Sequence, residues 1–161
     1  MKKVLFLSAI AIVFFFSSCE PPAPPDDGEK PGNNGTVDRE SPDFVTFANG
    51  KFPKTWVTYT WEVDDVVGYD DNYSLRCANY PVALVYAFKT VDTTAFVEFY
   101  TKGGDVNLYI DSEKATAVSF IAAENGWTKW LYTFEKGRHE FKWEAEGIRK
   151  YIDAVKFTVV K

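Results

Sequence analysis

Five aromatic side chains in or beside predicted loops are the residues best suited to bind a ligand: Trp56, Trp61, Tyr69, Tyr73 and Trp127. An exposed aromatic ring binds a sugar by stacking on the apolar face of the sugar ring. Most of these rings could instead pack in the core or against hairpins. Trp56 and Trp127 are the two expected to be exposed, because each opposes the main apolar parity of its strand.

The nucleophiles and bases of the chain do not form a catalytic set. His139 is the only histidine, and its predicted place on the face of Phe141 and Trp143 favours a core residue over a base. A zinc site would need three or four ligands, which the sequence does not bring together. Cys77 is expected to be a small buried hydrophobe in a strand. We predict no catalytic residue and do not expect an enzyme.

Two groups of carboxylates are noteworthy. Asp153 shares parity with Tyr151, Val155 and Phe157, which predicts that it points toward the core. A buried carboxylate is costly unless it is hydrogen-bonded, paired or bound to a metal, and a hydrogen bond to the backbone or to a tyrosine is the favoured interpretation for Asp153. Residues 64–71 (DDVVGYDD) gather four carboxylates around a glycine, but their spacing is not that of an EF-hand, which favours a solvated acidic loop.

The first residues have the features of an export signal. Lys2 and Lys3 precede an apolar run over residues 4–16, which is too short to span a bilayer because a span needs about 20 residues. The run ends in the sequence FSSC (residues 16–19), which resembles the lipobox of bacterial lipoproteins. This resemblance implies a signal peptide over residues 1–18 and a lipid on Cys19 that anchors the protein to a membrane.

The segment after the cysteine cannot form a core. Residues 20–42 contain six prolines, three glycines and six carboxylates, which predicts a tether over residues 19–42. Its acidic start at Glu20 resembles outer-membrane and surface lipoproteins of Bacteroidota, which implies a place in the cell envelope at the outer membrane. The formal net charge of the chain is −5, so nucleic acid is not an expected partner.

Residues 43–161 are predicted to form one all-β domain of two packed antiparallel sheets. Short alternating apolar runs are separated by Gly, Asn and Asp, and no stretch keeps a 3.6-residue period. The aromatic face of a hairpin around residues 135–137 should point to the core. The predicted strands cover residues 44–47, 55–61, 74–78, 82–89, 95–100, 106–111, 117–121, 128–134, 138–144 and 151–159.

Three segments resemble the jelly-roll modules of bacterial surface proteins, which are similar to carbohydrate-binding modules. They are the opening with Gly50, Pro53, Trp56 and Trp61 before residues 73–76 (YSLR), the middle segment 107–111 (NLYID), and the closing segments 137–143 (GRHEFKW) and 152–157 (IDAVKF). The resemblance implies a two-sheet jelly-roll β-sandwich. In similar sugar-binding sandwiches a last-strand Asp helps to hold a structural calcium with oxygens of the first strand, which implies Asp153 and Asp43 here.

Three functions remain open at this point. The resemblance favours an accessory module that binds glycan, ahead of a protein-interaction or adhesin module and, more distantly, a small hydrolase. A flat aromatic pair beside polar groups would indicate glycan binding. A broad apolar patch without such groups would indicate a protein partner.

Overall fold

The computed structural model describes residues 40–78 and 82–160. The predicted signal peptide, Cys19 and most of the tether lie outside the described residues, so these predictions remain predictions. Within the described ranges, no helix is both long and apolar enough to cross a membrane.

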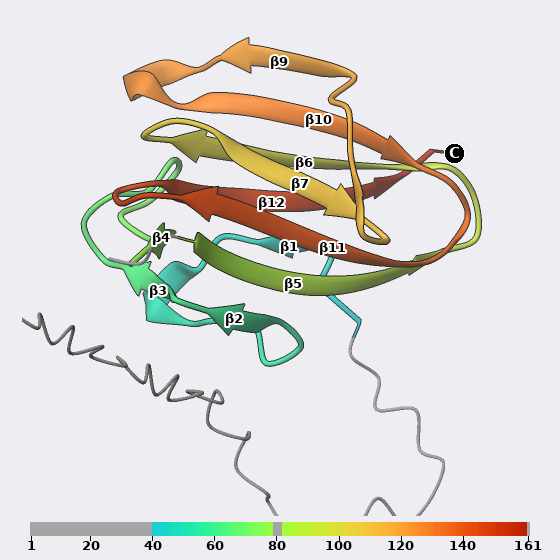
Figure 1. Cartoon of the computed structure of the whole chain (residues 1–161), viewed down its shortest axis with the longest axis horizontal. Coiled ribbons are helices and arrows are strands. Elements are labelled where there is room, and N and C mark those ends of the chain that lie inside the picture. Colours follow the sequence, from blue (N-terminus) through green and yellow to red (C-terminus); the bar gives the residue numbers. More distant parts are fainter. Residues whose placement is uncertain (1–39, 79–81, 161) are drawn as a thin grey trace, which may run out of the picture. The chain divides into compact units, whose positions relative to one another are not determined.

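The described chain forms two packed antiparallel sheets, as predicted (Figure 1). The larger sheet runs, in spatial order, β3 (Trp61–Asp64), β4 (Ser74–Cys77), β12 (Tyr151–Val159), β6 (Ala95–Lys102), β10 (Thr128–Phe134) and β9 (Ser119–Ala122), with β1 (Phe44–Val45) paired to β12. The smaller sheet runs β2 (Val57–Tyr59), β5 (Val82–Val91), β11 (Gly137–Glu146), β7 (Val106–Ile110) and β8 (Glu113–Lys114). Two short 3-10 turns, Ala48–Gly50 and Glu124–Gly126, lie between strands.

The core lies between the sheets and follows from the two-residue alternation of the strands. Buried and half-buried side chains alternate along the whole of β6. Trp143 is fully buried near the middle of the core, where its ring stacks on Trp56 at 5.2 Å between centroids and meets Phe99 edge-on at 5.8 Å. The burial of Phe141 and Trp143 confirms the predicted core face of the last hairpin.

Several predicted strands end within a few residues of the observed ones, and two larger differences change what packs together. The single strand predicted over residues 55–61 is two strands in different sheets, β2 and β3, because the chain turns at Thr60 with a φ of 64°. The packed domain also begins before residue 43. The backbone N–H of Ser41 donates to the carbonyl of Phe88 at 2.7 Å, and the Ser41 side chain is buried.

Candidate functional site

Three of the predicted sugar-binding residues are buried, so the prediction that Trp56 and Trp127 are exposed is wrong. Trp56 is 4% exposed, Trp127 2% and Trp61 5%. The indole N–H of Trp56 donates to the Ser41 hydroxyl at 2.8 Å in the interior. The two-residue alternation correctly assigned Trp127 to the sheet face that points away from the core. It could not show that residues 65–73, between β3 and β4, fold over that face and bury the ring. None of the three rings can stack on a sugar in the folded domain.

Tyr69 and Trp127 meet in an aromatic cluster beneath the β3–β4 loop. The Tyr69 ring stacks on Tyr100 at 3.6 Å between centroids and meets Trp127 edge-on at 6.0 Å. Tyr151 contacts the other side of Trp127 at 6.4 Å. Tyr73 is half-buried and packs at the margin of the core instead. This cluster therefore fastens the loop to the larger sheet.

Asp153 is fully buried, but it does not point into the core as its parity predicted. Its strand register shifts between Asp153 and Lys156, and Ala154 has a φ of 48°. Asp153 consequently pairs with Tyr100 on the outer face of the sheet, under the β3–β4 loop. Its Oδ2 accepts the backbone N–H of Tyr69 at 2.8 Å, and its Oδ1 accepts that of Ala154 at 2.7 Å.

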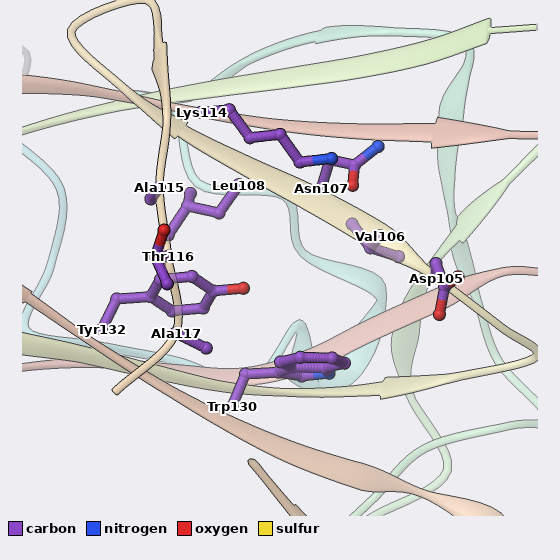
Figure 2. Close-up of a pocket in the computed structure, with 10 residues that line it drawn as sticks. All are labelled: Asp105, Val106, Asn107, Leu108, Lys114, Ala115, Thr116, Ala117, Trp130 and Tyr132. Carbon is purple, nitrogen blue, oxygen red and sulfur yellow. The ribbon is translucent and has the colours of Figure 1, made fainter. Parts of the chain in front are cut away.

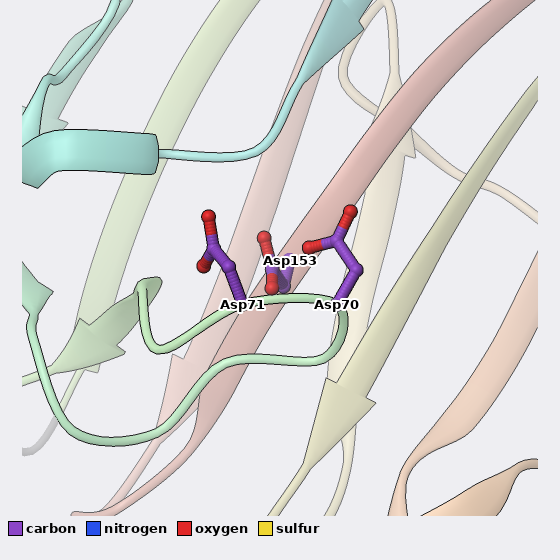
Figure 3. A group of neighbouring side chains, drawn as sticks. All are labelled: Asp70, Asp71 and Asp153. Atoms are coloured by element: carbon purple, nitrogen blue, oxygen red, sulfur yellow. The ribbon is translucent and has the colours of Figure 1, made fainter.

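Two further carboxylates of the loop, Asp70 and Asp71, lie beside Asp153 (Figure 3). One oxygen from each of the three residues lies within 4.8 Å of the others. Burial raises the pKa of Asp153 to about 7, and the charges of Asp70 and Asp71 add to the rise, although the two N–H donors oppose it. Three carboxylates at this spacing match the oxygen ligands that a hard cation such as calcium prefers.

Asp43 does not join these carboxylates, so the predicted pairing of Asp43 with Asp153 is wrong. Asp43 is exposed, and its Oδ1 accepts a hydrogen bond from the Lys89 ammonium at 2.6 Å. The error has a physical reason, because the loop and not the first strand covers Asp153. Asp70 and Asp71, and not Asp43, are the carboxylates beside Asp153. Both belong to residues 64–71, the segment that was interpreted as a solvated acidic loop.

A cavity of about 300 Å³ opens at the edge of the sandwich between β7 and β10 (Figure 2). Trp130 and Tyr132 of β10 form one wall, and Val106 and Leu108 of β7 lie opposite. The crossing from β8 to β9 closes one side. Polar side chains complete the lining: Asp105, Asn107, Lys114 and Thr116.

The aromatic wall of this cavity is held in place and partly accessible. The half-buried Trp130 donates its indole N–H to the Thr101 hydroxyl at 2.8 Å, which fixes the ring while leaving its face available. The Phe120 ring, whose residue is 68% exposed, lies 5.4 Å from it at an angle of 34°. The hydroxyl of Tyr132 points into the cavity, and because burial raises the pKa of Tyr132 to about 12, this phenol stays neutral.

Sequence reasoning missed Trp130 because its parity with Tyr132 and Phe134 assigned it to the core. The available signal was its strand partner: Trp130 pairs with Phe120 of β9, the last strand of the sheet. A core-facing residue next to an edge strand is covered on one side only. Trp130, like Tyr132, therefore combines a core-facing position with access to the cavity.

His139 and Cys77 have structural roles. The His139 ring nitrogens lie 2.6 Å from Asp111 Oδ2 and 2.9 Å from the carbonyl of Glu135, so both are engaged. Burial opposes ionisation of Asp111, but the Glu140 N–H and His139 outweigh it and lower the pKa of Asp111. Cys77 is 2% exposed, as predicted, and burial raises the pKa of its thiol.

No known protein-family profile matches the chain, and no curated protein matches it. Among solved structures, it is similar to the family 35 carbohydrate-binding module (CBM35) of Paenibacillus barcinonensis, with a TM-score of 0.50 and 13% identity over 73% of this chain and 98% of that one. A family 35 module of Clostridium thermocellum gives a TM-score of 0.49 and 11% identity over 66% and 94%. TmCBM61, solved in complex with β-1,4-galactotriose, gives 0.46 and 12% over 71% and 94%. The first likeness shows a common jelly-roll sandwich fold.

Proposed function

We propose that this chain is a non-catalytic glycan-binding module held at the cell envelope by a lipid on Cys19. One observation carries the binding proposal: the aromatic pair of Trp130 and Phe120 lies beside the polar lining of the edge cavity. Apolar ring faces and hydrogen-bonding edges are the two features that a sugar presents to a protein. The fold that the chain shares with the CBM35 of Paenibacillus barcinonensis supports the same class of ligand.

The cavity suits a neutral, hydroxyl-rich ligand in both size and chemistry. Its volume of about 300 Å³ lies at the lower end of small-molecule sites. Trp130 supplies a stacking face, the neutral Tyr132 hydroxyl can donate and accept, and Asn107 adds an amide at the rim. Lys114 and Asp105 carry opposite charges, so the lining has no single sign that would select an ion. We infer that the ligand is one or a few sugar units of a glycan.

We expect Trp130→Ala to weaken glycan binding by at least about fivefold, because loss of a stacking ring removes about 1 kcal/mol or more of contact energy. A glycan array followed by calorimetry, with the soluble chain from Glu20 onward, measures this. Phe120→Ala, at a largely exposed residue, should weaken binding without disturbing the fold. Tyr59→Ala removes another exposed ring, in the smaller sheet and outside the cavity, and serves as the matched control.

Three results would contradict this assignment. Undiminished binding in both Trp130→Ala and Phe120→Ala would exclude the edge cavity as the site. An equal loss in Tyr59→Ala would indicate a contact surface on the smaller sheet. Binding to no glycan at all would favour the protein-interaction alternative, for which Phe120 and Ile121 of β9, with Val118 just before the strand, offer an exposed apolar edge.

The anchoring proposal rests on the leader and on the position of the cysteine. Twenty residues separate Cys19 from Glu40, where the described domain begins. A proline-rich segment of that length reaches up to about 60 Å at about 3.1 Å per residue. Such a reach would hold the edge cavity clear of lipid headgroups.

We expect Cys19→Ser to abolish fatty-acid labelling of the chain and to move it from the membrane fraction, because the sulfur that forms the thioether is lost. Metabolic labelling with a tagged fatty acid followed by fractionation measures both effects. Cys77→Ser is the matched control, since Cys77 is buried in the domain. Labelling that survives in Cys19→Ser would overturn the proposed anchor.

A further inference from the structure

Strand β9 is an edge of the larger sheet and lacks the charged side chains that the edge strands β3 and β8 carry. The exposed Glu62 lies on β3, and the exposed Glu113 and Lys114 lie on β8, whereas the short edge strand β2 carries no charge. Such charges are the usual defence of an edge strand against pairing with another chain. All four residues of β9 are exposed, and none is charged.

The apolar character of this edge extends beyond the strand itself. Residues 115–123 (ATAVSFIAA) contain no charged residue, although the chain as a whole carries a net charge of −5. Val118 is 58% exposed, Phe120 68% and Ile121 63%. Charge therefore does not oppose the approach of a second copy at this edge, and apolar surface favours it.

The hydrogen bonds of β9 show which of its backbone groups are unused. The N–H of Ala123 donates to the carbonyl of Trp127 at 2.8 Å, and Ala122 lies opposite Thr128. Bonded and non-bonded pairs alternate in an antiparallel ladder. The backbone N–H and C=O groups of Ser119 and Ile121 thus face β10. The N–H and C=O groups of Phe120 and Ala122 face outward, where no strand of the described chain meets them.

We propose that two copies of this chain pair through β9 in antiparallel fashion, with Phe120 opposite Ala122 of the second copy. This register uses all the outward groups of both residues in both copies, which gives four hydrogen bonds. On the core-facing side of the joined sheet, this register sets the large Phe120 side chain against the small Ala122 side chain of the second copy. On the outer face, Ile121 meets Ile121 of the second copy at the twofold axis. A self-complementary match of this kind favours a second copy over an unrelated protein.

The pairing has a consequence for the glycan site, and this consequence rests on the proposed function. Phe120 pairs with Trp130 within each copy, so the joined sheet brings the aromatic pairs of both edge cavities to one face. Such a surface would engage two units of an extended glycan at once. Because the shared edge is short, the association is expected to be weak in solution, with a dissociation constant above about 10 µM. Anchoring on one membrane would raise the effective concentration.

Sedimentation equilibrium of the soluble chain from Glu20 onward tests the pairing. The weight-average mass should rise toward twice the monomer value as the concentration reaches the millimolar range. Ile121→Lys places two like charges at the twofold axis and should keep the chain monomeric. Ile148→Lys is the matched control, because Ile148 is similarly exposed, at 55%, but lies outside β9. It should associate like the unchanged chain.

Cysteine cross-linking tests the register. Ile121→Cys should form a disulfide-linked dimer under mild oxidation, since a pair at the twofold axis has the required spacing. Ser119→Cys, on the same face of the same strand, should not, because its two copies lie too far apart. The buried Cys77 does not compete. A mass that stays monomeric at every concentration, or an association that persists in Ile121→Lys, would overturn the proposal. Neither readout involves glycan, so failure here is distinct from failure of the proposed function.

Discussion

In the absence of divalent cations, the domain is expected to lose about 4 kcal/mol of unfolding free energy to Asp153 as the pH rises from below 4 to above 7. The pKa of Asp153 is about 7 in the folded chain, against the ordinary value of 3.8 for an aspartate in the unfolded chain. Each unit of such a difference corresponds to about 1.4 kcal/mol. Because the folded pKa is raised, the full stability is present at low pH. It is lost between about pH 4 and 7, where the carboxyl is ionised in the unfolded chain but stays protonated beside Asp70 and Asp71 in the folded one.

Asp153→Asn isolates this effect from that of other carboxylates such as Asp111, whose pKa shift acts in the opposite direction. The amide keeps one oxygen for the backbone N–H of Tyr69 or Ala154, but not for both. The variant should therefore lose about 1–3 kcal/mol at pH 4, because one buried donor is left unsatisfied. Between pH 4 and 8 the variant should lose less unfolding free energy than the unchanged chain. The difference should equal the contribution of about 4 kcal/mol that Asp153 makes. Urea unfolding at pH steps with a chelator measures both curves.

Calcium gives the same experiment a second arm. If the three carboxylates hold the ion, calcium should raise the urea midpoint of the unchanged chain at pH 7.5 and should leave that of Asp153→Asn in place. Asp43→Asn is the control, because Asp43 bonds to Lys89 away from the cluster. An equal calcium response in Asp153→Asn would exclude the cluster as the binding site. A flat difference curve between pH 4 and 8 would contradict the raised pKa.

The architecture could be predicted from the sequence because it depends on a repeated local signal. Alternating residues along β5, β6 and β11 identify both the strands and their core faces. The exceptions occur where one residue adopts an unusual backbone conformation. Thr60 and Ala154 both have a positive φ, yet neither is the glycine that commonly marks such a position. Their turns redirected Trp61 to another sheet and Asp153 to another face.

The candidate site was harder to predict because it depends on what covers a face. The two-residue alternation correctly places Trp127 on the sheet face that points away from the core. The β3–β4 loop that buries the ring comes from a distant part of the chain. Trp130 has the parity of a core residue and is half-exposed only because β9 is the last strand. Tyr69 and Asp153 were both singled out from the sequence. Their direct hydrogen bond joins positions 84 residues apart.

Replacing Trp56 should therefore affect folding and not the site. Trp56→Ala is expected to cost about 3–5 kcal/mol of unfolding free energy, because the ring leaves a cavity in the core. That ring stacks on Trp143 and meets Phe47 edge-on at 5.8 Å. Natural domains have about 5–15 kcal/mol to lose, so much of this variant should be unfolded at 37 °C. Trp56→Phe keeps an aromatic filler without the N–H bond to Ser41 and should lose less.

Comparing Trp56→Ala with Trp130→Ala separates packing from recognition. Urea unfolding followed by circular dichroism gives the stability of each variant, and glycan affinity is then measured at a temperature where both are folded. Trp56→Ala should regain its affinity once folded, because its ring is 4% exposed. Trp130→Ala should remain folded and weak in binding, because the half-buried ring adds less to the core than to the cavity wall. A stable Trp56→Ala chain that binds no glycan would return Trp56 to the binding surface and would refute the packing described for it.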